Sequence, residues 1–99
     1  MEDMFVRIEK EIEKTLIRIA RKVKKEMRLS SLISQFTSIK VNTKDICLSI
    51  YYNDKYVASM NLWDDYKNYY SIRYLADQLK EKLLSYASVK ELKKLEEKL

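Results

Sequence analysis

Three residue types are missing from this sequence, and each absence excludes a class of function. Glycine, proline and histidine do not occur among the 99 residues, and cysteine occurs once. Without glycine there is no glycine-rich phosphate loop and no dinucleotide-binding fingerprint. Without histidine there is no Ser-His-Asp triad and no histidine-ligated metal. A single thiol allows neither an internal disulfide nor a multi-cysteine zinc site. We therefore expect a protein that is not an enzyme and that uses no cofactor and no metal.

Long apolar runs are also missing. No stretch approaches the roughly 18 apolar residues that cross a bilayer. The chain begins Met-Glu-Asp, which is acidic where a signal peptide carries positive charge. We expect one domain, residues 1–99, that is soluble and intracellular. The lone thiol agrees with a reducing compartment.

Basic residues are in excess. Lysine and arginine number 20 against 15 acidic residues, so the formal net charge is +5, and 46% of the residues are hydrophobic. This composition is typical of a globular protein with a densely charged surface. Nine of the basic side chains lie in the first 28 residues.

The first of two long amphipathic helices is predicted over residues 4–28. Its apolar residues recur at spacings of three and four and form one stripe. They are Phe5, Ile8, Ile12, Leu16, Ile19, Val23 and Met27. The pattern changes phase after Arg28, so we expect the helix to end or bend near residues 29–31, and a short second helical turn to follow at 31–35.

Residues 37–62 alternate between apolar and polar, which predicts strands of an antiparallel meander. Turns are expected at 42–44 and at Asn53-Asp54, where Asn and Asp tolerate positive φ in place of glycine. A two-residue turn at Asn53 would put Tyr56, Ala58 and Met60 on the face opposite Leu48 and Ile50. A three-residue loop would pair Tyr52 with Tyr56 and keep all of them together. Because burial sets register, we favour the longer loop or a bulge.

A second long helix is predicted over 65–87, with Asp64 or Asp65 as its cap. Its inner stripe comprises Tyr69, Ile72, Leu75, Ala76, Leu79, Leu83 and Tyr86. The sequence from Ser88 to Glu91 matches a capping box and predicts a separate short C-terminal helix. The expected fold class is α+β, with the two long helices packed on one face of a three-stranded antiparallel meander.

The first candidate site is a row of cations on the first helix, opposite its apolar stripe, which we call the basic ridge. It comprises Arg7, Lys10, Lys14, Arg18, Arg21, Lys25 and Arg28. Like charges four residues apart destabilise a helix by about 0.2–0.5 kcal/mol per pair. A polyanion would relieve this repulsion and release counterions on binding. The ridge is therefore a candidate nucleic-acid-binding surface, with an ordinary solvated helix face and a contact surface for acidic protein partners as the alternatives.

The second candidate site is aromatic. On the predicted second helix, one face opposite the apolar stripe carries Tyr66, Tyr70, Tyr74 and Leu84. Tyrosine is favoured at protein interfaces and also stacks on unpaired bases. We expect this face to be a homodimer interface, with local packing or a ligand contact as the alternatives.

Two further features have ordinary structural explanations. Asp64-Asp65 and the pair Asp77 and Glu81 resemble acid–base or Mg²⁺ carboxylates, but no third polar partner converges with them. We read them as helix-start residues and a solvated face. Cys47 has no basic neighbour in sequence to activate its thiol, so we expect a small packed residue.

The predicted order of elements, a helix followed by three strands and a second helix, is similar to that of the double-stranded-RNA-binding domain. In that family, a lysine cluster at the start of the last helix binds phosphates. The matching residues 68–74 offer Arg73 and no lysine. The likeness is one of topology and transfers no residue.

As a whole, the chain resembles small proteins of filamentous and rod-shaped viruses of hyperthermophilic archaea, of the lipothrixvirus and rudivirus type. The segments that carry the resemblance are 1–5, the strand 46–52 and the tyrosine-rich 66–74. It implies a thermostable protein of the host cytoplasm, with no assigned activity. A Lys/Glu-rich surface agrees with high temperature.

These observations lead to two function hypotheses. The first is a non-enzymatic interaction or structural protein, homodimeric, with a host or virion protein as a further partner. The alternative is a nucleic-acid-binding regulator that uses the basic ridge. Neither involves a membrane or a small-molecule substrate.

Overall fold

The computed structural model describes residues 4–63 and 69–98, with the side chains of 5, 6 and 89–98 outside the description. The elements are α1 (Met4–Met27), α2 (Ser31–Gln35), β1 (Thr37–Asn42), β2 (Cys47–Tyr52), β3 (Lys55–Asn61) and α3 (Ile72–Lys98). The strands form an antiparallel sheet in the order β1-β2-β3. The α+β class, the N-terminal helix, the meander and the second long helix are thus confirmed. The molecule is elongated, 62 × 31 × 23 Å.

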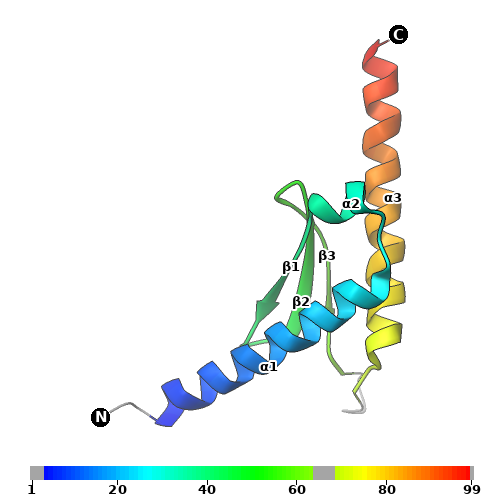
Figure 1. Ribbon diagram of the computed structural model, residues 1–99. Helices are drawn as coiled ribbons and strands as arrows, with labels where there is room; N and C mark the ends of the chain where they lie inside the picture. Colours follow the sequence, from blue (N-terminus) through cyan, green and yellow to red (C-terminus); the bar gives the residue numbers. More distant parts are fainter. Residues whose placement is uncertain (1–3, 64–68, 99) are drawn as a thin grey trace.

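Both long helices pack on one face of the sheet, α1 against β1 and α3 against β3 and β2, and they also contact each other (Figure 1). The core lies between these layers and comprises Leu16, Ala20, Val23 and Met27 of α1, Leu48, Ile50, Ala58 and Leu62 of the sheet region, and Leu75, Ala76, Leu79 and Leu83 of α3. The opposite face of the sheet carries polar residues, among them Lys40, Ser49 and Ser59, which follows from the period of two.

The stripe of α1 is buried only where the sheet and α3 lie beneath it. Leu16, Val23 and Met27 are buried, whereas Ile8 is 50% exposed. The N-terminal part of α1 projects beyond the sheet (Figure 1). Amphipathic spacing therefore predicts the correct face of α1 but not how far along it the core extends.

The short turn predicted at 31–35 is confirmed as α2. The Ser30 side chain accepts a hydrogen bond from the Ile33 backbone N–H at its N-terminus. At its C-terminus, the Thr37 hydroxyl donates to the Ile33 carbonyl at 2.8 Å. These two caps satisfy backbone groups that a five-residue helix cannot satisfy internally.

The β2–β3 hairpin combines a short turn with a bulge. Asn53 and Asp54 both have positive φ (52° and 64°), as a two-residue type I′ turn requires, and Tyr52 pairs with Lys55. The register then shifts between Ile50 and Tyr51, so that Ile50 faces Ala58. The bulge alternative is correct, whereas the three-residue loop and its pairing of Tyr52 with Tyr56 are wrong.

The bulge also corrects the predicted position of Tyr56. Tyr56 was expected on the apolar face, but it lies opposite Tyr51 and is 57% exposed. The extra residue, Val57, lies between Tyr56 and Ala58 and changes the face on which the strand presents its side chains. Only the residues beyond it, Ala58 and Met60, share the face of Leu48 and Ile50.

The second long helix begins later than predicted. Residues 64–68, and with them the predicted caps Asp64 and Asp65, lie outside the described residues. The cap is Ser71, whose side chain accepts the Tyr74 N–H at 3.0 Å. Tyr69 precedes the helix and is 78% exposed, so its place in the inner stripe was wrong. It instead forms an isolated bridge and an edge-to-face ring contact with Trp63.

The separate short C-terminal helix is also corrected, because α3 runs without a break from Ile72 to Lys98. Ser88 lies inside α3 and does not begin a new helix. A capping box starts a helix only where the preceding backbone is not helical, and no glycine or proline interrupts this segment. The C-terminal part of α3 extends beyond the sheet (Figure 1).

Candidate nucleic-acid interface

All seven residues of the basic ridge are exposed to solvent on α1. They lie on the side of the helix away from Leu16, Val23 and Met27, which are buried. At 1.5 Å per residue, the ridge from Arg7 to Arg28 is about 32 Å long. Neighbouring ridge residues are therefore about 4.5–6 Å apart along the helix axis.

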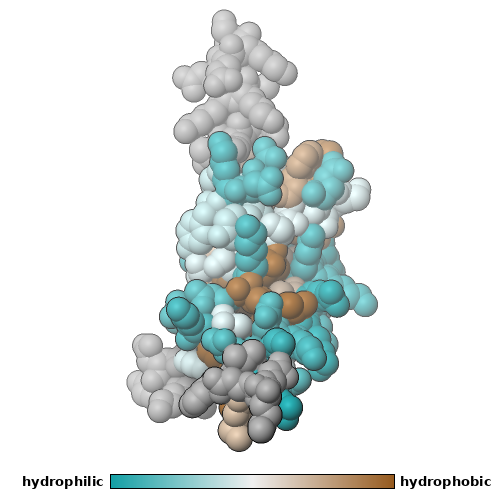
Figure 2. All heavy atoms as spheres, turned by 90° about the vertical axis from the view of Figure 1, so that its left-hand side faces the viewer, coloured by the Kyte–Doolittle hydropathy of each residue, from teal (hydrophilic) through white to brown (hydrophobic). Residues whose placement is uncertain are grey.

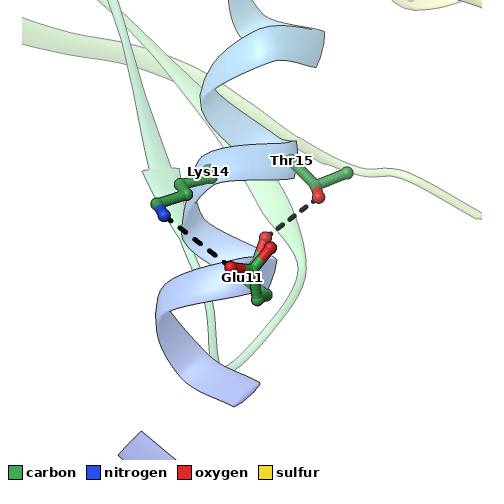
Figure 3. Close-up of polar contacts among 3 residues, drawn as sticks. All are labelled: Glu11, Lys14 and Thr15. Carbon is green, nitrogen blue, oxygen red and sulfur yellow. Dashed lines mark hydrogen bonds and ion pairs between the residues drawn. The ribbon is translucent and has the colours of Figure 1, made fainter. Parts of the chain in front are cut away.

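The N-terminal half of the ridge is partly neutralised by Glu11. Figure 3 shows Lys14 and Thr15 both pointing toward Glu11. The Lys14 Nζ lies 3.7 Å from a Glu11 carboxylate oxygen, and the Thr15 hydroxyl donates to the Glu11 carbonyl at 2.9 Å. Both ends of the ion pair are exposed, so the pair contributes little to stability. It does lower the local positive charge.

The C-terminal half of the ridge lacks such a partner. Within the residues that the structure describes, no ion pair is made by Arg18, Arg21, Lys25 or Arg28. Arg21, Lys24, Lys25 and Arg28 line one depression of about 380 Å³, together with Leu29 and Ser34. No carboxylate lines it. This end therefore has the highest density of uncompensated positive charge on the ridge.

Lys24 has a structural role beside the ridge. Its Nζ donates a hydrogen bond of 2.8 Å to the Thr37 carbonyl and so ties the last turns of α1 to the start of β1. Lys24 and Lys25 also lie in the last turn of α1, where the helix dipole favours cations. The dipole thus explains two of the cations at this end but not Arg18 or Arg21, which lie further from it.

The predicted aromatic stripe is not one helix face. Tyr66 lies outside the described residues, and Tyr70 precedes α3. Tyr70 is half-buried against the core and its ring stacks on Tyr74, with centroids 4.7 Å apart and planes 19° apart. Tyr74 and Leu84 are 43% and 37% exposed on α3. The structure therefore brings two of the four residues together, as a local stack.

Sequence reasoning missed an aromatic group on the open face of the sheet. The Lys40 ammonium lies 4.4 Å from the centre of the Tyr51 ring, and Tyr51 makes an edge-to-face contact with Tyr56. The Tyr56 hydroxyl is hydrogen-bonded to Ser59. The bulge moves Tyr56 onto this face. The alternation of residues along one strand does not predict this position, because the bulge depends on pairing with the neighbouring strand.

The remaining candidates behave as ordinary structural residues. Asp77 and Glu81 are exposed on α3, and the described residues contain no group of three metal-ligating side chains. Cys47 is buried. Burial and the neighbouring Asp45 carboxylate raise the pKa of its thiol, against the opposing effect of a hydrogen bond with Ser49. A raised pKa lowers the thiolate fraction and therefore the reactivity of the thiol.

Among the described residues, no helix is long and apolar enough to cross a membrane. Comparison with known protein families, with curated proteins and with solved structures found no match.

Proposed function

We propose that this protein is a non-enzymatic nucleic-acid-binding protein that contacts the phosphate backbone through the basic ridge. The observation that carries the proposal is the exposure of all seven cations, of which Arg18, Arg21, Lys25 and Arg28 have no acidic partner among the described residues. A duplex presents one phosphate per strand for about every 3.4 Å of its axis. A ridge of this length therefore faces several phosphates at once.

The composition of the ridge favours contacts with the phosphate backbone over the reading of a mixed sequence. It contains lysine and arginine only, whose bidentate contacts with bases are made to guanine, and no asparagine or glutamine that would read adenine. Phosphate contacts carry no sequence information. We therefore expect binding that depends strongly on salt and only weakly on nucleotide sequence.

The experiment measures binding of labelled duplex DNA, single-stranded DNA and RNA by fluorescence anisotropy over a range of salt concentrations. If about four phosphates are neutralised, the logarithm of the association constant for duplex DNA falls with the logarithm of salt with a slope of about −3.6. Reversing Arg18, Lys25 and Arg28 together to Glu should weaken binding by at least about tenfold and flatten this slope. Arg21 is left unchanged because it also lines a groove between α1 and β1.

A matched control reverses three exposed cations outside α1, namely Lys55, Arg73 and Lys82. Both triple variants have a formal net charge of −1, six below the parent value of +5. The control should bind clearly more tightly than the ridge variant. Equal loss of affinity in the two variants, or a parent that binds none of the three nucleic acids, would refute the proposal.

An interaction or structural role is the second candidate function. The observation that favours it is the exposure of Tyr74 and Leu84 on α3, together with Ile8 on the projecting part of α1. Homodimerisation belongs to this candidate, and it is compatible with nucleic-acid binding. Viral origin in a hot archaeal host and residence in its cytoplasm stay predictions.

A further inference from the structure

Beyond Thr37, the outer edge of β1 pairs with no strand among the residues that the structure describes. On the β2 side, the Phe36 carbonyl accepts a hydrogen bond from the Asn53 N–H at 2.8 Å. The next carbonyl, that of Thr37, accepts from Lys24 of α1 instead. Because inward and outward directions alternate along an antiparallel strand, Ile39 and Val41 direct their backbone N–H and C=O groups away from β2. Within the described part of the chain, no hydrogen bond from another element reaches those groups.

A groove runs beside this edge, between α1 and β1, and we call it the edge groove. Its volume is about 430 Å³, and its apolar lining comes from Ile17, Ala20, Ile39 and Val41. Figure 2 shows this side of the molecule, with apolar atoms in the middle and hydrophilic side chains around them. An unpaired strand edge next to an apolar groove is a site for the addition of another strand.

The charges beside the edge groove are polarised. Arg21 and Lys24 line it toward the start of β1, where Lys24 meets Thr37. Lys40 also lines the edge groove, but its ammonium lies over the Tyr51 ring on the other face of the sheet. Glu13 lies toward the end of β1, in a depression that it shares with Val41, Asn42 and Lys44. Glu13, Ile17 and Arg21 are four residues apart along α1, so opposite charges lie about 6 Å on either side of Ile17.

We propose that a second copy of this chain docks on the β1 edge and joins the two three-stranded sheets into one. A twofold axis through Ile39 pairs the two β1 strands antiparallel, because two copies related by it run in opposite directions. The backbone N–H of each Ile39 then donates a hydrogen bond to the backbone carbonyl of Ile39 in the other copy. The same axis brings Glu13, in the adjoining depression of each copy, toward Arg21 in the edge groove of the other copy. Each of these two charges then meets an opposite charge.

Charge also disfavours one neighbouring register of the two strands. With the axis at Ile39, Lys40 lies opposite Ser38 of the second copy. Moving the axis from Ile39 to Lys40 would place the two Lys40 side chains opposite each other, which destabilises the pairing. An acidic peptide would carry charge opposite to that of Arg21 and Lys24. Its remaining acidic residues or its uncharged backbone would, however, lie against Glu13, which would gain no opposite charge. The self-complementary charges therefore favour a second copy as the occupant.

The test exchanges the two charges and measures molar mass by light scattering over a range of protein concentrations. Glu13→Arg alone and Arg21→Glu alone each replace two attractive contacts by two repulsive ones across the axis. Each should raise the dimer dissociation constant by at least about tenfold. The double variant Glu13→Arg/Arg21→Glu should restore the dimer, and so should an equimolar mixture of the two single variants.

Two further variants distinguish loss of the dimer contact from a general change in the charge of α1 and from loss of the fold. Arg18→Glu changes the charge of α1 on the ridge and should leave the dimer intact. Val41→Pro removes an outward N–H from an edge position, which sheets tolerate, and should weaken the dimer while circular dichroism stays unchanged.

The proposal would be overturned by a parent that stays at the mass of one chain at all concentrations. It would also be overturned by a dimer that survives all three disruptive variants, or by a mixture of the single variants that stays monomeric. A monomeric parent that binds a peptide with an acidic C-terminus would assign the edge groove to another partner.

Discussion

At the scale of single residues, four positions in the described part of the chain adopt a left-handed backbone conformation that glycine usually occupies. They are Arg28, Ile46, Asn53 and Asp54, with φ between 48° and 64°. Asn and Asp tolerate this conformation well, whereas a β-branched isoleucine does not. Ile46 adopts it just before β2, and its carbonyl accepts the Leu62 N–H at 3.1 Å. A glycine-free chain therefore places ordinary residues where backbone strain is greatest.

Arg28 offers a test that separates stability from binding. It follows the last residue of α1 with φ of 50°, where glycine is preferred. Arg28→Gly should raise the free energy of unfolding by about 1 kcal/mol, because glycine has no Cβ to clash in this conformation. It should also weaken nucleic-acid binding, because a ridge cation is lost.

Urea denaturation and fluorescence anisotropy measure these two effects. Arg28→Ala is the matched control, since it loses the same charge but keeps the Cβ. Its binding should match that of Arg28→Gly without the gain in stability. Equal stability of the two variants would show that Arg28 is not strained.

At the scale of elements, the β2–β3 hairpin shows how two local preferences are reconciled. Asn53-Asp54 favours a two-residue turn, and burial requires Ala58 and Met60 to share the face of Ile50. One extra residue, Val57, satisfies both preferences. The conflict was visible in the sequence, but the position of the bulge depends on cross-strand packing.

Deleting Val57 should leave a foldable protein. The pairs on both sides of the bulge, Tyr51 with Tyr56 and Ile50 with Ala58, would then follow each other in regular register. We expect a loss of at most about 2 kcal/mol, the contribution of a partly buried valine. The measurement is the free energy of unfolding in urea. Deletion of Ser59 is the control and should abolish folding, because Met60 would move to the polar face. Similar losses in both deletion variants would contradict this account of the bulge.

At the scale of the whole molecule, stability comes from one core between two helices and three strands. The surface around it is dense in lysine and glutamate, and 35% of all residues are charged. Ion-pair networks of such residues gain importance at high temperature, because the cost of desolvating charges falls as temperature rises.

If the origin predicted from the sequence, a virus of a hyperthermophilic host, is correct, the midpoint of thermal unfolding should lie above about 90 °C. Differential scanning calorimetry at several protein concentrations measures it, and a midpoint that rises with concentration would also report dimerisation. A midpoint between about 45 and 65 °C, the range of ordinary mesophilic domains, would contradict the predicted origin.

The sequence by itself determined the α+β class, the extent of α1, the short α2, the meander and the face on which the basic ridge lies. These follow from local periodicity and from charge spacing along one helix, which need no knowledge of distant residues. The tertiary structure decided the bulge at Val57, the start of α3 at Ile72 with Ser71 as its cap, the position of Tyr70 and the edge groove. Each of these depends on which segments meet in space, and a one-dimensional pattern does not contain that information.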